Sequence, residues 1–240
     1  GPEILKRINQ IIKNKNIELK NDLKIYWNNF PIAYLSKGND YELVLSNRNT
    51  NNLFDLSSTK KHIKDVNPDC IINAAAKVGG ININNEKRFE FITENLKINM
   101  NILESCLEMP SIKIINLGSS CIYPLDADNP IKEEYIMSGK LEPTNSPYAM
   151  AKLTAIEIGN SMKQQFGMNI TNLMPTNLYG PNDNFHPTNS HVIPGLISKF
   201  HNGKINKQET VQIWGDGSPL REFLYVDDLS NAISFIIEND

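Results

Sequence analysis

Tyr148 and Lys152 are the two residues of this sequence whose types and spacing best suit proton transfer. They lie four positions apart in the segment YAMAK, so a helix places the phenol and the ammonium on one face. A tyrosine ordinarily titrates near pH ~10, which is too high for acid–base work at neutral pH. A neighbouring ammonium favours the phenolate, and the hydroxyl of Ser119, at the end of an apolar run, can share the proton. We therefore predict a phenol that gives or takes a proton at a carbinol or carbonyl during hydride transfer.

The same pair occurs on helix surfaces without any function, so the elements around it decide its meaning. Short apolar runs alternate with helical stretches along most of the chain, a pattern typical of a parallel sheet covered by helices on both faces. The predicted strands are 23–27, 41–46, 70–76, 112–117, 169–174 and 211–214. The predicted helices are 3–14, 31–37, 58–66, 86–108, 146–166, 191–201 and 227–238. The predicted fold class is α/β, a Rossmann-like doubly wound parallel sheet.

Small and hydroxyl-bearing residues follow three of the predicted strands, in the segments 74–80, 118–121 and 175–180. In a doubly wound sheet, ligands bind in the crevice outside the carboxyl ends of the strands. We therefore expect these three segments to line one crevice, with the Tyr148 helix facing it.

Composition excludes several classes of protein. The net charge of −3 and the lack of a basic block argue against a nucleic-acid partner, and no apolar run approaches the ~20 residues of a membrane span. The three cysteines have spacings that suggest neither a disulfide framework nor a metal site, so we expect a cytoplasmic protein without a metal.

Five segments together resemble the GDP-L-fucose synthase family of the extended short-chain dehydrogenases/reductases. They are INAAAKVGGI, LGSSCIYP, LEPTNSPYAMAK, MPTNLYGPNDNFHPTNSHVIP and WGDGSPLREFLYVDD, and the similarity runs from about residue 41 to 238. The resemblance implies an NADPH-dependent epimerase/reductase that converts GDP-4-keto-6-deoxy-D-mannose to GDP-L-fucose. It also implies a homodimer formed through the helices at 86–108 and 146–166.

The resemblance assigns roles to five catalytic residues. Tyr148 becomes the proton donor of the reduction, with Lys152 and Ser119 as its partners. Cys121 and His191 become the acid/base pair of the epimerisation, which is reasonable because a thiol and an imidazole both act near neutral pH.

The resemblance also implies contacts to both ligands. Arg48 suits a 2′-phosphate, which favours NADP(H) over NAD. The implied cofactor contacts are Arg48, Leu117, Gly118, Ser119, Ser120, Lys152, Pro175, Thr176, Asn177, Leu178 and His191. The implied contacts to the GDP-sugar are Lys199, Trp214 and Arg221.

The chain departs from the family pattern at both ends. No glycine lies between Leu23 and Lys37, where a phosphate-binding turn is expected, and the family continues beyond Asp240 with further substrate-binding elements. We therefore divide the chain into an atypical N-terminal segment, 1–40, which opens with a Gly-Pro pair resembling a tag remnant, and a Rossmann-like catalytic domain, 41–240, with a truncated C-terminal substrate lobe.

Two alternatives stay open at this stage. One is a catalytically impaired or non-catalytic relative that acts as a binding or interaction subunit. The other is a different nucleotide-sugar epimerase or dehydratase, although dehydratases carry an acidic pair where this chain has Ser120 and Cys121.

Overall fold

A computed structural model describes residues 32–37, 41–47, 49–186 and 189–239. Its main sheet has five strands in the order β2-β1-β3-β4-β5. The parallel part consists of β3 (Cys70–Asn73), β4 (Lys113–Leu117) and β5 (Asn169–Leu173). These strands confirm the predictions at 70–76, 112–117 and 169–174. The isoleucine runs of β3 and β4 are typical of strands buried on both faces, whereas β5 is less buried.

The edge beyond β3 differs from the predicted pattern. β1 (Ile32–Lys37) is antiparallel both to β3 and to β2 (Tyr41–Ser46). The strand predicted at 41–46 is confirmed, but the helix predicted at 31–37 is wrong. Its six residues pair on both sides in the sheet, and the three-residue link to β2 is short enough for a hairpin. The predicted helix 3–14 and strand 23–27 lie outside the described residues.

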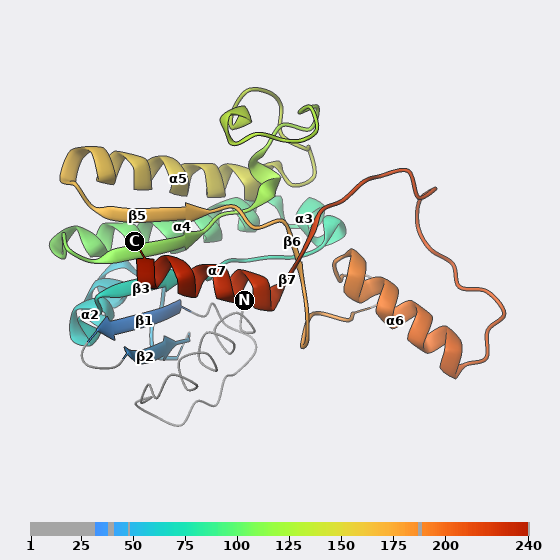
Figure 1. Cartoon of the computed structure of the whole chain (residues 1–240), viewed down its shortest axis with the longest axis horizontal. Coiled ribbons are helices and arrows are strands. Elements are labelled where there is room, and N and C mark those ends of the chain that lie inside the picture. Colours follow the sequence, from blue (N-terminus) through green and yellow to red (C-terminus); the bar gives the residue numbers. More distant parts are fainter. Residues whose placement is uncertain (1–31, 38–40, 48, 187–188, 240) are drawn as a thin grey trace.

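Helices cover the two faces of the sheet unequally (Figure 1). One face is covered by α2 (Leu56–Val66), α4 (Arg88–Ser105) and α5 (Ser146–Phe166), and the other by α7 (Val226–Asn239). Side-chain alternation along each strand explains how both faces are apolar. Ile71 and Ile114 belong to the core under α4, whereas Ile72 and Ile115 belong to the core with α7.

The ends of the predicted helices have recognisable caps. The Asp55 carboxylate accepts a hydrogen bond from the Ser58 amide (2.6 Å) at the start of α2, and α5 ends at Gly167, whose φ of 68° favours glycine. All five helices predicted from residue 58 onward are present. The structure adds a short helix α3 (Ile81–Glu86) and the 3₁₀ turns η1 (Cys106–Glu108), η2 (Ser120–Ile122) and η3 (Glu133–Tyr135).

A second, two-stranded parallel sheet lies beyond the carboxyl end of β5. It pairs β6 (Asn177–Tyr179) with β7 (Phe223–Tyr225), and between them the chain forms α6 (Val192–Ile205) and an extended arm, residues 206–222. Figure 1 shows α6 and the arm projecting away from the main sheet. The strand predicted at 211–214 is wrong, because these residues lie in the arm and have no strand partner within the described part of the chain.

None of the helices in the described ranges is both long enough and apolar enough to cross a membrane.

Candidate active site

Tyr148 and Ser119 meet at the carboxyl end of β4. Tyr148 lies in the first turn of α5, where Pro147 precedes it, and its hydroxyl bonds the Ser119 side chain. The hydroxyl is buried, although other atoms of the residue are partly exposed to solvent. Burial raises the pKa of Tyr148 well above its ordinary value, the nearby Cys121 adds to the rise, and the Ser119 hydrogen bond opposes it. At neutral pH the phenol therefore holds its proton and can donate it.

Lys152 lies one helical turn beyond Tyr148 and is 3% exposed. Its Nζ donates to the Leu117 carbonyl oxygen (2.6 Å) and lies 5.8 Å from the centroid of the Tyr148 ring. Burial lowers the pKa of Lys152 to about 8. The lysine is thus a buried donor beside the phenol, as the YAMAK spacing predicts.

The ends of β4 and β5 are joined by backbone hydrogen bonds. The Gly118 amide donates to the Leu173 carbonyl (2.7 Å), and the Ser120 amide donates to the Pro175 carbonyl (3.2 Å). A Cβ on Gly118 would lie 3.1 Å from the Leu173 oxygen, so only glycine permits this approach without a shift. The structure therefore brings together the starts of the segments 118–121 and 175–180, two of the three that were predicted to line one crevice.

Cys121 follows directly in the 3₁₀ turn η2. Its amide donates to the Ser119 Oγ (3.3 Å), and its thiol is free and partly buried. Cys121 is near enough to Tyr148 to raise the pKa of the phenol, and its amide bonds the same Ser119 that bonds the phenol. A single serine therefore links the two predicted chemistries, because Ser119 contacts both the proton donor and the turn that holds the thiol.

His191 comes from a different part of the fold. It is an exposed residue at the amino end of α6, and no contact between it and Tyr148 or Cys121 occurs among the described residues. The loop before it packs closely on the turn after β3, since a Cβ on Gly80 would lie 3.1 Å from the Ser190 carbonyl oxygen. This contact holds the start of α6 at the edge of the crevice.

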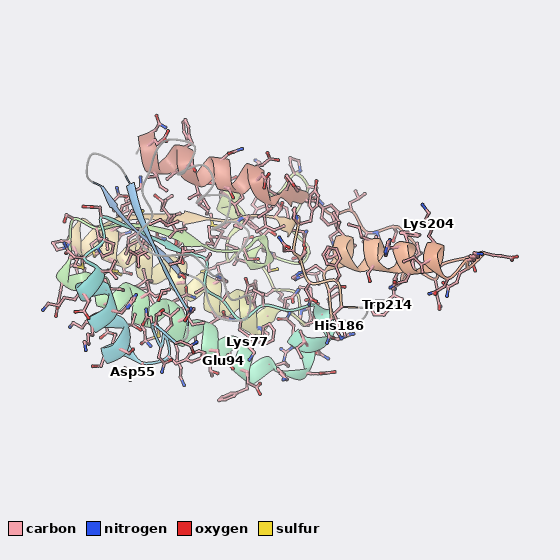
Figure 2. The ribbon with its side chains drawn as sticks, turned by 90° about the horizontal axis from the view of Figure 1, so that it is seen from below. Asp55, Lys77, Glu94, His186, Lys204 and Trp214 are labelled. Carbon is pink, nitrogen blue, oxygen red and sulfur yellow. The ribbon has the colours of Figure 1, made fainter. Side chains whose placement is uncertain are left out.

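The predicted contacts to the sugar nucleotide lie on α6 and the arm. The Lys199 Nζ lies 4.5 Å from the centroid of the Trp214 ring, and Trp214 is 69% exposed. Figure 2 shows Trp214 beside α6, on the part of the molecule that projects from the sheet. Arg221 is exposed and bonds the neighbouring Leu220 carbonyl (3.1 Å), so it does not join the other two. Arg48, predicted to bind a 2′-phosphate, lies outside the described residues.

Asn177 and Leu178 lie in β6, at the base of the arm. The Asn177 side chain donates to the Glu222 carbonyl (2.9 Å), which ties the last residue of the arm to β6. Beside this sheet, a hollow of about 260 Å³ is lined mainly by aromatic and aliphatic side chains, including Tyr179, Phe185, Ile197 and Tyr225.

Two features of the site escaped the sequence analysis. Lys77, just after β3, pairs with Glu94 of α4 (2.7 Å), and Figure 2 shows the two side chains directed toward one another. The other feature is a set of buried asparagines under the strand ends. Its signal in the sequence is an asparagine near the end of each of the apolar runs CIIN, KIINL and NITNL.

Fold and site together define an NAD(P)-type α/β enzyme domain, and comparison with known proteins agrees. Residues 29–240 match the model of the NAD dependent epimerase/dehydratase family, and the chain belongs to this family.

The most informative relatives are GDP-L-fucose synthases. The chain is 44% identical to GDP-L-fucose synthase of Escherichia coli over 204 residues, which is 85% of this chain and 64% of that protein. It is 51% identical to GDP-L-fucose synthase 1 of Arabidopsis thaliana over 171 residues, 71% of this chain and 53% of that protein. The chain thus spans about half to two thirds of the length of these relatives.

A solved structure shows the same architecture. The GDP-L-fucose synthetase of Naegleria fowleri bound to NADP superposes with a TM-score of 0.77 at 28% identity, covering 98% of this chain and 69% of that one. The family resemblance seen in the motifs is therefore confirmed.

Proposed function

We propose that this chain is the cofactor-binding and catalytic part of an NADP(H)-dependent epimerase/reductase that converts GDP-4-keto-6-deoxy-D-mannose to GDP-L-fucose. The observation that carries the proposal is the Ser119–Tyr148–Lys152 cluster at the end of β4, with the Cys121 thiol beside it. The names of the relatives support the substrate class, since GDP-L-fucose synthases match along most of the chain.

In the reduction, Tyr148 supplies the proton. A hydride for the C4 carbonyl carbon would come from NADPH held beside Lys152, and the Tyr148 hydroxyl donates its proton to the carbonyl oxygen. The Ser119 hydrogen bond favours the phenolate that remains. The Lys152 ammonium lies 5.8 Å from the centroid of the ring, and a positive charge at that distance attracts the phenolate. Burial raises the pKa of Tyr148, which keeps the phenol protonated at neutral pH but makes it a weaker acid. The Ser119 hydrogen bond opposes this rise and so favours release of the proton.

In the epimerisation, Cys121 and His191 exchange protons with the carbons next to the keto group. One group removes a proton and the other returns one from the opposite side, which inverts the carbon. Cys121 is fixed by the turn that Ser119 caps, whereas His191 is carried by the start of α6. The two groups lie on different elements of the fold, which supports an approach from opposite faces of the sugar, as inversion requires.

The described residues fit the nicotinamide-ribose half of the cofactor. The buried ammonium of Lys152 uses one of its three donors on Leu117, and further donors beside Tyr148 suit ribose hydroxyls. Gly118 and the segment Pro175–Leu178 would line the same crevice.

The direction of β1 bears on how the pyrophosphate half of the cofactor would be bound. In a doubly wound sheet the phosphate-binding turn follows a parallel strand. β1, which lies beside β3, is antiparallel to it, so the carboxyl end of β1 lies at the edge of the sheet opposite the crevice. The carboxyl end of β1 is therefore not one of the strand ends that line the crevice.

NADPH should consequently bind this chain about a hundredfold or more weakly than it binds relatives with a glycine turn. The loss of two or three backbone hydrogen bonds to a charged group, at ~1.5–3 kcal/mol each, accounts for such a difference. Fluorescence titration of NADPH into the purified chain measures it, with Lys152→Met as a control that removes the ribose donor. Micromolar or tighter binding by the unmutated chain would contradict the prediction.

We also propose that the chain forms a homodimer through α4 and α5, which lie side by side on one face of the sheet (Figure 1). Both helices carry exposed apolar side chains, including Phe89 (74%), Met100 (45%) and Met150 (42%). Such a contact is isologous, so each helix meets the same pair of helices in a second copy.

Light scattering at tens of micromolar should therefore report about twice the monomer mass. Met150→Lys should shift the chain toward monomer, whereas Leu220→Lys on the arm, at an 88% exposed position, should not. A monomer for the unmutated chain, or an equal effect of both substitutions, would refute the assignment.

We also propose a reducing, cytoplasmic location for the protein. The free state of Cys70, Cys106 and Cys121 supports it.

The function itself is tested by supplying GDP-4-keto-6-deoxy-D-mannose and saturating NADPH. We expect sugar-dependent oxidation of NADPH and formation of GDP-L-fucose, separated by chromatography. If neither the oxidation nor proton exchange at the sugar occurs, the non-catalytic alternative becomes the better description.

A further inference from the structure

Three asparagines form a row across the carboxyl ends of the parallel strands. Asn73 of β3 lies opposite Asn116 of β4, and Asn116 lies opposite Asn172 of β5. Asn73 and Asn116 are each 1% exposed. Their neighbours Ile72 and Ile115 belong to the α7 core, so alternation places the asparagines on the face covered by α4 and α5.

The side chains of this row are joined into one hydrogen-bonded chain. Asn73 Nδ2 donates both to Asn116 Oδ1 (2.9 Å) and to Asn99 Oδ1 (3.0 Å) on α4. Asn116 Nδ2 donates in turn to Asn172 Oδ1 (3.1 Å). Asn99 Nδ2 donates to the main-chain carbonyl oxygen of Asn95 (2.9 Å). We call these five residues the amide row. Buried amides need hydrogen-bond partners. The hydrogen bonds of the row form when the three strand ends keep these relative positions, and a shift of one strand end would break them.

One end of the amide row holds the turn that follows β3. Asn73 Oδ1 accepts from the Ala75 amide (3.1 Å). Asn95 bonds the backbone of Lys77 twice, accepting from its amide (2.8 Å) and donating to its carbonyl (3.0 Å). The segment that lines one side of the crevice is therefore fixed to α4 by side-chain amides.

The middle of the row holds the catalytic strand end. Asn116 directly precedes Leu117, whose carbonyl accepts from Lys152, and Ser119 follows two residues later. A displacement of Asn116 would move the Leu117 carbonyl and the Ser119 hydroxyl together. Both groups contact side chains of α5, so such a movement changes the distances within the site.

A row of aliphatic residues would join the strands without fixing them in this way. Ile71, Ile114 and Ile170 form such a row two residues earlier, on the same face and in the same register. Apolar contacts are non-directional and tolerate small slides, whereas hydrogen bonds between amides specify both distance and direction. The change from isoleucine to asparagine coincides with the point where the strands meet the crevice.

We propose that the amide row is the positioning device of the active site, setting the end of β4 against the turn after β3 and against α5. Its members are positioning residues, since they act through Leu117, Ser119 and Lys152. The proposal rests on the proposed function in treating this crevice as the catalytic one.

The first test needs no catalysis. Cys121 is the one partly exposed thiol among the three cysteines, so its rate of alkylation by N-ethylmaleimide reports the geometry of η2. Asn116→Leu, which breaks the row at its centre, should change this rate by about threefold or more, located by mass spectrometry. Cys70 and Cys106 should stay protected, which shows that the chain remains folded.

Asn101→Leu is the matched control. Asn101 lies on α4 beside two members of the row and, like Asn116, donates one side-chain hydrogen bond, to the Leu53 carbonyl (2.8 Å), but it lies outside the amide row. Its substitution should leave the rate at Cys121 unchanged. An equal change in both variants, or an unchanged rate in Asn116→Leu with the buried cysteines protected, would overturn the proposal.

A second variant and a second readout cover the remaining outcomes. Asn172→Leu breaks only the last link of the row and should shift the rate at Cys121 in the same direction by less. If Asn116→Leu does not fold, an unchanged alkylation rate at Cys121 in the Asn172→Leu variant would overturn the proposal. In an active chain, Asn116→Leu should lower kcat about tenfold with little change in the KM of the sugar, because misplacement affects the reacting groups more than binding. If the unmutated chain is inactive, the proposed function fails while the thiol measurement still decides on the amide row.

Discussion

Replacing Tyr148 by phenylalanine should lower the rate of keto-sugar reduction by about 10²–10⁴-fold, the usual contribution of a positioned general acid. The ring still fills its place at the start of α5, but the hydrogen bond to Ser119 and the donated proton are both lost. Loss of NADPH absorbance with the keto-sugar as substrate measures the rate. Tyr135→Phe, at a partly buried tyrosine of η3 outside the site, is the matched control and should retain full activity.

The epimerisation should respond to a different substitution. Cys121→Ser should slow exchange of solvent deuterium into the keto-sugar, followed by NMR without NADPH, because a serine hydroxyl loses its proton far less readily than a thiol and so does not supply the base. Tyr148→Phe should leave most of this exchange intact. If Cys121→Ser exchanges deuterium at the full rate, Cys121 does not have the role assigned to it.

The sequence predicts the catalytic strand ends well, because the signals there are local. The runs CIIN and KIINL are apolar up to their asparagine, which identifies buried parallel strands, and NITNL repeats the pattern with a buried Ile170. The spacing of YAMAK places Tyr148 and Lys152 on one helix face. Ser119 then follows from its place after β4. The contact between Ser119, Tyr148 and Lys152 then follows from the alternation of strands and helices, which packs α5 beside the end of β4.

The predictions that failed depended on distant partners. The segment IAYLSK forms a strand because β2 and β3 lie on either side of it, and no local pattern reveals that pairing. The segment VQIW has the composition of a strand, but no strand pairs with it within the described residues, and Trp214 is exposed. Residues such as His191 and Arg221, on or beside the projecting α6 and arm, are placed by the tertiary structure alone.

The buried charge of Lys152 should make the protein less stable at neutral pH than it would be without it. Burial lowers the pKa of Lys152 from 10.5 to about 8, so between these values the unfolded chain binds more protons than the folded one. The free energy of unfolding therefore rises with pH across this window, by about 3 kcal/mol in total from this residue. Below pH ~8 both states are protonated, and the cost of the buried charge is fully present.

Lys152→Met should accordingly raise the free energy of unfolding at pH 7 by roughly 1–3 kcal/mol, the lost bond to Leu117 offsetting part of the gain. It should also remove the rise with pH and reduce the reductase rate to background. Urea unfolding at several pH values measures the difference between variant and parent. Cys70, Cys106 and Tyr148 also have raised pKa values, which lower the free energy of unfolding at higher pH. Because all three residues are present in both proteins, their contributions largely cancel in the difference between variant and parent.

Lys163→Met is the control, since Lys163 is an exposed lysine in the last turn of the same helix. Its substitution should change stability by less than about 1 kcal/mol and leave the pH dependence as it is. A Lys152→Met variant less stable than the parent at pH 7 would mean that the folded state stabilises the ammonium. In the expected case, the cluster that performs the reduction is kept at a cost to the stability of the fold, because the charge that favours the Tyr148 phenolate must be buried beside it.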